Sequence, residues 1–201
     1  MNGGLTMLTH LRMTGRFHLA SPGAAYGKHD HVAFTIDGKR QLRYHDTRKF
    51  GRFYLPESTA MLDRLGPEPL SRQFTARKLA KRLAAHRRQL KPLLLDQHFL
   101  AGLGNIYVDE ALWDAGLHPT RASDRLTDGE VRGLHRAIRK VLRRGLRNLG
   151  TTLGTGETTF YSVAGHRGRN RDELKVFRRT GEPCPRCRRI ITRLVVGQRS
   201  T

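Results

Sequence analysis

The clearest structural signal in the chain is the stretch VAFTIDGKRQLRY, residues 32–44. Its apolar side chains alternate with small or polar ones, which is the period of a strand with one buried face. Asp37 and Gly38 separate two such runs, and an Asp-Gly pair in that position favours a tight hairpin turn. The stretch therefore predicts two antiparallel strands, and related patterns from Leu5 to Leu55 predict a strand-rich N-terminal segment.

After the glycine and prolines at 66–69 the pattern becomes helical. We expect one helix to begin after Thr75, which has a side chain suited to an N-cap. A second is expected from Asn105 to a glycine cap at 116, and a third from the capping-box sequence 127–130. Residues 71–150 are therefore expected to fold as a helical domain.

The rest of the C-terminal part shows less order. Residues 150–171 are rich in glycine and threonine and have little periodicity, so we expect a loop. Residues 175–196 predict a strand, a cysteine knuckle and a second strand.

The charge selects a class of partner. Lysine and arginine number 38 against 17 aspartates and glutamates, which gives a net charge of +21. Such a surface attracts polyanions, because each neutralised phosphate releases counterions, so nucleic acid is the expected partner. The sequence contains no apolar run near the roughly 18 residues of a membrane span, and Met1–Leu5 do not resemble a signal peptide. We therefore expect a cytoplasmic protein with no membrane partner.

Two stretches permit both a functional and a structural interpretation. Gly102 and Gly104 precede Asn105 at a helix start, which suits an anion but is also an ordinary helix entry. Arg48 and Phe50 lie in the stretch DTRKFG, residues 46–51, where cations bind phosphates and an aromatic ring wedges between bases, unless Phe50 is simply core. In both cases the residues alone favour the structural interpretation.

Cys184 and Cys187 form a C-x-x-C knuckle near the end of the chain. A structural zinc site needs four ligands, and all histidines precede this knuckle. Half of a zinc site, a redox pair and two incidental cysteines remain as interpretations. No thioredoxin-like pattern accompanies the knuckle, so we prefer half of a zinc ribbon.

Taken in order, seven sequence blocks resemble the bacterial formamidopyrimidine-DNA glycosylases and their endonuclease VIII relatives, and the formamidopyrimidine branch fits better. The blocks are residues 10–15, 28–31, 46–51, 65–70, 91–110, 116–119 and 180–201. The resemblance implies a monomeric α+β protein with a partial N-terminal β-sandwich, a helix-two-turn-helix module and an incomplete C-terminal zinc ribbon. The expected segments are a truncated sandwich lobe (1–66), a helical DNA-binding domain (71–150), a mobile lesion loop (151–174) and a zinc-finger hairpin (175–201).

The resemblance also implies base-excision repair of double-stranded DNA. Such enzymes remove oxidised purines, including 8-oxoguanine and formamidopyrimidines, and then cleave the strand at the abasic sugar. A bacterial enzyme of this kind is expected on the nucleoid. By position, the resemblance implies that Met13, Arg48 and Phe50 fill the space that the extruded base leaves in the duplex. The residues that it implies for DNA contacts are His29, Arg48, Lys49, Lys91 and Asn105. Arg199 matches the acid of the second elimination, and Cys184 and Cys187 match two of the four ligands of one Zn²⁺.

Some family residues have no counterpart in this sequence. The family's N-terminal proline nucleophile, the glutamate after it and a catalytic lysine before the block at 10–15 are not matched, and no proline precedes Pro22. Two further zinc cysteines are not matched either. We therefore expect an internal fragment of a glycosylase, truncated at both ends. The alternatives are a catalytically inactive remnant that binds damaged DNA and, less favoured, a basic RNA-binding protein with a zinc knuckle.

Overall fold

The computed structural model describes residues 6–56, 60–154 and 160–201. The chain divides into two compact units, Met1–Thr59 with Gly145–Glu173 and Ala60–Arg144 with Leu174–Thr201. The first is rich in strands and the second in helices, which confirms the α+β fold. The predicted four-part division stays a prediction, and it differs from these units in separating 151–174 from the strands. Among the described residues, no helix combines the length and apolar character needed to cross a membrane.

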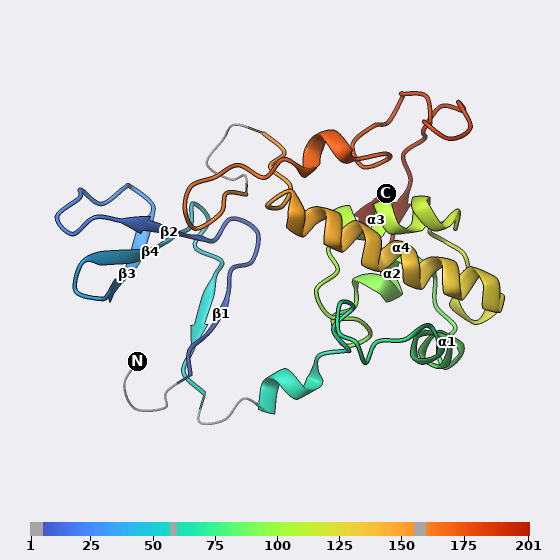
Figure 1. Ribbon diagram of the computed structural model, residues 1–201, viewed down its shortest axis with the longest axis horizontal. Coiled ribbons are helices and arrows are strands. Elements are labelled where there is room, and N and C mark those ends of the chain that lie inside the picture. Colours follow the sequence, from blue (N-terminus) through green and yellow to red (C-terminus); the bar gives the residue numbers. More distant parts are fainter. Residues whose placement is uncertain (1–5, 57–59, 155–159) are drawn as a thin grey trace. The chain divides into compact units, whose positions relative to one another are not determined.

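In the described residues of the strand-rich unit, the strands form two antiparallel sheets (Figure 1). Their strands are β1 (Leu8–His10), β2 (Arg16–Ala20), β3 (Asp30–Ile36), β4 (Arg40–His45) and β5 (Arg52–Tyr54). The order β2-β4-β3 forms the larger sheet, and β1 pairs with β5 in the smaller. The ring of Phe53 on β5 lies 6.3 Å from Phe17, 6.0 Å from Phe34 and 4.9 Å from Tyr44, all on the larger sheet. Aromatic packing between the sheets is what a sandwich requires.

The predicted hairpin between β3 and β4 is confirmed. Asp37 and Gly38 have φ values of +54° and +62°, the left-handed conformation that both central residues of a type I′ turn adopt. The N–H of Lys39 donates to the carbonyl of Ile36 at 3.2 Å and closes the turn. The Asp-Gly pair therefore sets the register of the two strands.

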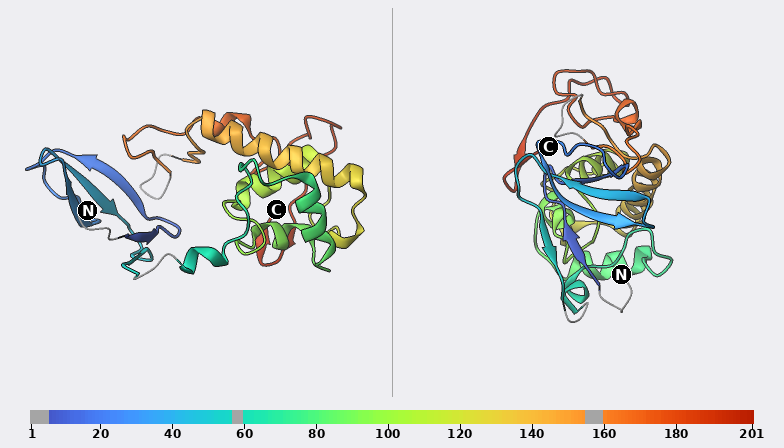
Figure 2. Two further views of the ribbon diagram at one scale, coloured as in Figure 1. Left: turned by 60° about the horizontal axis from the view of Figure 1, so that its bottom comes forward. Right: turned by 90° about the vertical axis from the view of Figure 1, so that its left-hand side faces the viewer.

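Four helices form the other unit (Figure 2). They are α1 (Ala76–Ala84), α2 (Leu90–Leu95), α3 (Asn105–Ala115) and α4 (Asp128–Arg147), whose last turn crosses the boundary between the units. Apolar side chains from all four share one core, with Leu79, Leu93, Val108 and Ile138 fully buried. The core places the start of α3 beside α2, and both helices carry residues assigned to DNA binding.

The helix boundaries follow the capping residues predicted from the sequence. The hydroxyl of Thr75 accepts the N–H of Lys78 at 3.3 Å, and Gly116 ends α3 with φ of +69°. At the start of α4 the N–H of Thr127 donates to the Glu130 carboxylate at 2.7 Å, and the N–H of Glu130 donates to the Thr127 hydroxyl at 3.3 Å. The predicted capping box is therefore confirmed.

Replacing Thr127 with alanine is expected to lower the free energy of unfolding by about 1 kcal/mol, because the side-chain cap of α4 is lost. Urea denaturation followed by circular dichroism measures this change. Thr127→Ser keeps the hydroxyl and serves as the control. Equal midpoints for the alanine variant and the wild type would show that the cap contributes nothing.

The strand predicted to start near Lys175 is wrong. The backbone N–H groups of Lys175, Val176 and Phe177 donate to the carboxylate of Glu110 at 2.9 to 3.1 Å, and the segment turns there. N–H groups that point at a buried carboxylate are not available for a strand ladder. In the described C-terminal part the strands are β6 (Val195–Val196) and β7 (Arg199–Ser200).

The loop predicted at 150–171 is confirmed for residues 150–154 and 160–169, and its mobility stays a prediction. Residues 150–154 and 160–169 contain isolated bridges but neither helix nor extended strand, and a short 3₁₀ turn follows at Asn170–Glu173. Residues 155–159 of the predicted lesion loop lie outside the described part of the chain.

Candidate nucleic-acid interface

The loop after β4 is organised by Asp46, which is fully buried. One carboxylate oxygen accepts the hydroxyl of Thr14 and, at 3.2 Å, the N–H of Arg48. The other accepts the hydroxyl of Tyr44 at 2.8 Å and the N–H of Gly51 at 2.9 Å. The carboxylate thereby fixes both ends of the loop that carries Arg48 and Phe50.

These contacts also determine the charge of Asp46. Burial raises the pKa of the carboxyl, but hydrogen bonds from Thr14, Gly51, Tyr44 and Arg48 together hold it well below its ordinary value. Burial and the hydrogen bond to Asp46 raise the pKa of the Tyr44 phenol. Asp46 is therefore a buried anion at neutral pH, with its charge compensated by hydrogen bonds.

Met13, Arg48 and Phe50 form an exposed cluster on the surface above the buried Asp46 carboxylate. A guanidinium nitrogen of Arg48 lies 3.4 Å from the sulfur of Met13, and its guanidinium carbon lies 5.3 Å from the ring centre of Phe50. Met13 is 69% exposed and Phe50 is 52% exposed, so the interpretation of Phe50 as core is wrong. The structure brings together the three residues assigned to the vacated space, while their role stays a prediction.

The backbone beside this cluster adopts an uncommon conformation. Arg12, next to Met13, and Lys49, next to Phe50, both have φ of +56°. Non-glycine residues in the left-handed region carry a cost of order 1–3 kcal/mol, and they cluster at functional sites. Lys49 is exposed in this conformation, as a phosphate contact requires.

His29 connects two of the stretches assigned to DNA binding. Its carbonyl accepts the N–H of Asp46 at 3.0 Å, and its half-buried ring lies edge-on to His45 with ring centres 5.7 Å apart. The sequence blocks at 28–31 and 46–51 are therefore neighbours in the fold.

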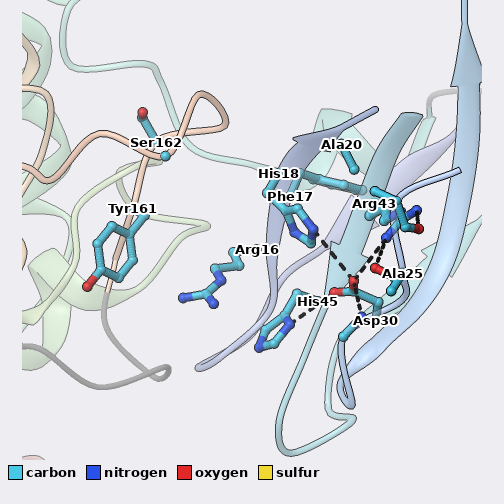
Figure 3. A pocket seen from close by; sticks show the side chains of 13 residues that line it. Arg16, Phe17, His18, Ala20, Ala25, Asp30, Arg43, His45, Tyr161 and Ser162 are labelled. Carbon is cyan, nitrogen blue, oxygen red and sulfur yellow. Dashed lines mark hydrogen bonds and ion pairs between the residues drawn. The ribbon is translucent and has the colours of Figure 1, made fainter. Parts of the chain in front are cut away.

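A second buried carboxylate, Asp30, lies in a histidine-rich pocket (Figure 3). Nδ1 of His45 lies 3.1 Å from it, Nε2 of His18 lies 3.6 Å away and the guanidinium of Arg43 lies 3.8 Å away. Burial raises the pKa of Asp30, but hydrogen bonds from the Gly27 N–H and His45 outweigh burial and lower it.

The predicted lesion loop lines the other side of this pocket. The pocket has a volume of about 540 Å³, and Tyr161 and Ser162 contribute to its lining, with the Arg16 side chain extending toward Tyr161 (Figure 3). The guanidinium of Arg16 lies 5.4 Å from the ring centre of Tyr161. The lining therefore combines aromatic, cationic and carboxylate groups, which suits a polar ligand.

In the helical unit, Asn105 begins α3 and lies beside the C-terminal hairpin. Its side-chain amide donates to the carbonyl of Ser200 at 3.2 Å, and its Oδ1 is buried without a hydrogen-bond partner among the described residues. Arg199, the residue before Ser200, is exposed on β7. The structure therefore brings Asn105 and Arg199 to the same end of α3.

Lys91 is fully buried, which its assignment to a DNA phosphate did not anticipate. Its Nζ donates to Asp109 at 2.7 Å and to the Ser200 carbonyl at 2.6 Å. Burial lowers the pKa of the lysine, the pairing with Asp109 raises it, and the charge of Arg199 lowers it further. In this arrangement the Lys91 ammonium is hydrogen-bonded to Asp109 and Ser200. Its direct contact with a DNA phosphate stays a prediction.

The cysteine knuckle has the form of half a zinc site. Cys184 is buried and Cys187 is exposed. The indole N–H of Trp113, 3.4 Å from Sγ, and then the N–H groups of Cys187 and Arg186 lower the pKa of Cys184 to about 6. A stabilised thiolate fits zinc. However, the described residues contain no group of three or more histidines, cysteines or acidic residues placed to hold a metal.

Motif spacing does not indicate the roles of the buried carboxylates Asp46, Asp109 and Glu110. Asp46 is the first residue of the stretch at 46–51, and nothing in that stretch shows that it is buried. The signal for the other two was two adjacent acids in an otherwise apolar stretch of α3, because carboxylates in buried positions need partners.

Three family models match the chain. They are the formamidopyrimidine-DNA glycosylase N-terminal domain over residues 1–53, the formamidopyrimidine-DNA glycosylase H2TH domain over residues 65–156, and the zinc finger found in FPG and IleRS over residues 181–201. The third match supports zinc binding by the knuckle segment.

Curated relatives agree with these models. The formamidopyrimidine-DNA glycosylase of Protochlamydia amoebophila is 43% identical over 202 residues, which cover all of this chain and 73% of that protein. The formamidopyrimidine-DNA glycosylase of Herpetosiphon aurantiacus is 45% identical, with 98% of this chain and 71% of that protein covered. The chain thus spans about three quarters of these relatives' length.

Solved structures give the same result. Lactococcus lactis Fpg in complex with DNA containing an abasic site has a TM-score of 0.87 and 36% identity, covering 97% of this chain and 72% of that chain. The MutM (FPG) protein of Thermus thermophilus has a TM-score of 0.87 and 39% identity, covering 100% of this chain and 74% of that chain.

Proposed function

Because this chain belongs to the formamidopyrimidine-DNA glycosylase family, we propose that it acts as a monomer on damaged double-stranded DNA in base-excision repair. The reaction breaks the bond between an oxidised purine and its sugar, and the strand is then cleaved at the abasic site. Solved relatives were crystallised with DNA containing an abasic site or a Fapy-dG lesion, which supports this choice of substrate.

The observation that carries the proposal is the exposed cluster of Met13, Arg48 and Phe50 on the loop held by Asp46. A base leaves the stack only if the gap and the orphaned partner base are stabilised. The Phe50 ring inserts between base pairs, the Met13 side chain fills the gap, and the Arg48 guanidinium donates hydrogen bonds to the orphaned base.

Phosphate contacts are proposed for both units. His29 and Lys49 contact the backbone near the Arg48 loop, and Asn105 does so from the N-terminus of α3, where backbone N–H groups favour an anion. Arg199 contacts the phosphate beside the damaged sugar and stabilises it as the leaving group of the second elimination. Its guanidinium offers a planar fork of N–H donors that matches phosphate oxygens, which suits that role.

The pocket lined by Tyr161 and Ser162 is proposed to receive the extruded base, because it has aromatic and polar walls next to the lesion loop. Cys184 and Cys187 are proposed to supply two thiolates of one zinc ion. A bound zinc ion would hold the knuckle structurally and take no part in bond cleavage.

Binding to three fluorescent duplexes tests the proposal: one with an abasic analogue opposite cytosine, one with 8-oxoguanine opposite cytosine, and one undamaged. Fluorescence anisotropy at fixed salt is expected to give at least a 10-fold lower Kd for the abasic duplex than for the undamaged one. Equal affinity for all three would reduce the protein to a non-specific DNA binder and contradict the proposal.

A second candidate is binding of damaged DNA without chemistry, because the exposed cluster of Met13, Arg48 and Phe50 can recognise a gap in the base stack by contact alone. Borohydride trapping on the 8-oxoguanine duplex distinguishes the two. A trapped covalent adduct would establish an amine nucleophile within these 201 residues. Tight lesion binding with no adduct would favour the binding function.

A further inference from the structure

A buried network joins the C-terminal hairpin to α2 and α3 in the helical unit. Lys91 lies in the first turn of α2, Asp109 in the second turn of α3, and Ser200 on β7. The ammonium of Lys91 donates to Asp109 at 2.7 Å and to the Ser200 carbonyl at 2.6 Å. One cation therefore ties three segments that are distant in sequence.

Asp109 holds this network together. Its side chain is 4% exposed, and one carboxylate oxygen accepts both the Lys91 ammonium and, at 2.6 Å, the hydroxyl of Thr201. Its neighbour Glu110 accepts the N–H groups of residues 175–177 and pairs with Arg144 instead. The two adjacent carboxylates therefore serve different segments, and Asp109 alone of the two serves the hairpin.

The residues that Asp109 anchors flank Arg199. The Ser200 carbonyl accepts hydrogen bonds from the Lys91 ammonium and the Asn105 amide, and the Thr201 hydroxyl donates to Asp109. Arg199 itself is exposed, so its backbone is held by buried contacts while its guanidinium remains at the surface. This is the arrangement expected for a side chain that must meet a phosphate at a fixed position.

We propose that Asp109 is the positioning residue for Arg199, acting through Lys91 and Thr201 and not by contact with DNA. The proposal rests on the proposed function, because it takes the DNA phosphate beside the damaged sugar as the ligand of Arg199. It assigns Lys91 to the interior of the site, where its charge balances Asp109 and its hydrogen bond fixes Ser200. Removing the carboxylate leaves a buried ammonium uncompensated and releases Thr201.

The test is a double-mutant cycle measured on the abasic duplex. Asp109→Asn is expected to raise the Kd about 10-fold and to reduce the slope of log K against log salt by about 1, the loss of one phosphate contact. Arg199→Gln is expected to do the same, and the double variant to lose no more than either alone. Additive losses, or an Asp109→Asn variant with wild-type Kd and slope, would overturn the proposal.

Two further variants keep the test decisive. Asp114→Asn is the matched control, because Asp114 on the same helix pairs with Lys140 at 2.7 Å but on the exposed side, and it is expected to leave Kd and slope unchanged. If Asp109→Asn does not fold, Thr201→Val tests the other link of the network. It is expected to raise the Kd several-fold, and Thr201→Ser to restore it; equal Kd values for the two would contradict the proposal.

The outcome also separates this proposal from the proposed function. If the wild-type protein binds abasic and undamaged duplexes equally, the proposed function fails. If the wild type discriminates and the Asp109 and Thr201 variants discriminate equally well with unchanged salt slopes, only the positioning role fails.

Discussion

Replacing Asp46 with asparagine is expected to lower the free energy of unfolding by about 3–5 kcal/mol. Both carboxylate oxygens accept two donors each, and an amide nitrogen in place of either oxygen would face two donors without accepting from them. Each buried donor left unsatisfied costs about 1–3 kcal/mol. Urea denaturation at pH 7 measures the loss. Asp37→Asn, in an exposed pair with Arg40, is the control and is expected to change stability by less than about 0.5 kcal/mol.

The pH dependence gives this prediction a second signature. The folded-state pKa of Asp46 lies below the value of about 3.9 for an unfolded aspartate. The stability that it contributes is therefore present above about pH 4 and is lost as the pH falls toward the folded-state pKa. The difference between the wild type and Asp46→Asn is expected to shrink below pH 4. A difference that is absent at pH 7, or constant from pH 7 to pH 3, would contradict the role of Asp46 as a buried anion.

The second large effect is expected at the surface of the same loop. Phe50→Ala is expected to raise the Kd for the abasic duplex about 10-fold to 100-fold and to leave the Kd for undamaged duplex nearly unchanged. Stacking of an aromatic ring on a base contributes about 1–3 kcal/mol, and this contact forms only where a base has left the stack. Anisotropy titrations on the two duplexes measure the ratio.

Tyr26→Ala provides the matched control for Phe50. Tyr26 is another exposed aromatic of the strand-rich unit, 58% exposed, and it also stacks on an arginine, with the Arg43 guanidinium 4.0 Å from its ring centre. Its loss is expected to affect neither duplex. Equal losses on damaged and undamaged DNA for Phe50→Ala would remove the wedge role and leave Phe50 as a general contact.

The features that the sequence predicted correctly depend on neighbouring residues. The Asp37-Gly38 turn, the Thr127 and Glu130 capping box and the Gly116 cap each require only residues within a few positions of one another. Local geometry decides such features, and a single sequence displays it.

The features that were missed depend on contacts between distant residues. The loop at 46–51 is held by Asp46, whose carboxylate accepts the hydroxyl of Thr14, 32 positions earlier, and the Lys91 ammonium donates to the carbonyl of Ser200, 109 positions away. The strand expected near Lys175 does not form because Glu110, 65 positions earlier, collects its N–H groups. Motif spacing identified which residues matter, but it did not show which of them face solvent.

The most direct test of the account places a photo-crosslinking residue, p-benzoylphenylalanine, at position 50 and irradiates complexes with a duplex that carries an abasic analogue opposite cytosine. The account predicts that the crosslink maps to the complementary strand within one nucleotide of the orphaned cytosine and is absent on undamaged duplex. Crosslinks spread along both duplexes alike, or none at all in a complex that anisotropy shows to be formed, would contradict the insertion of this loop into damaged DNA.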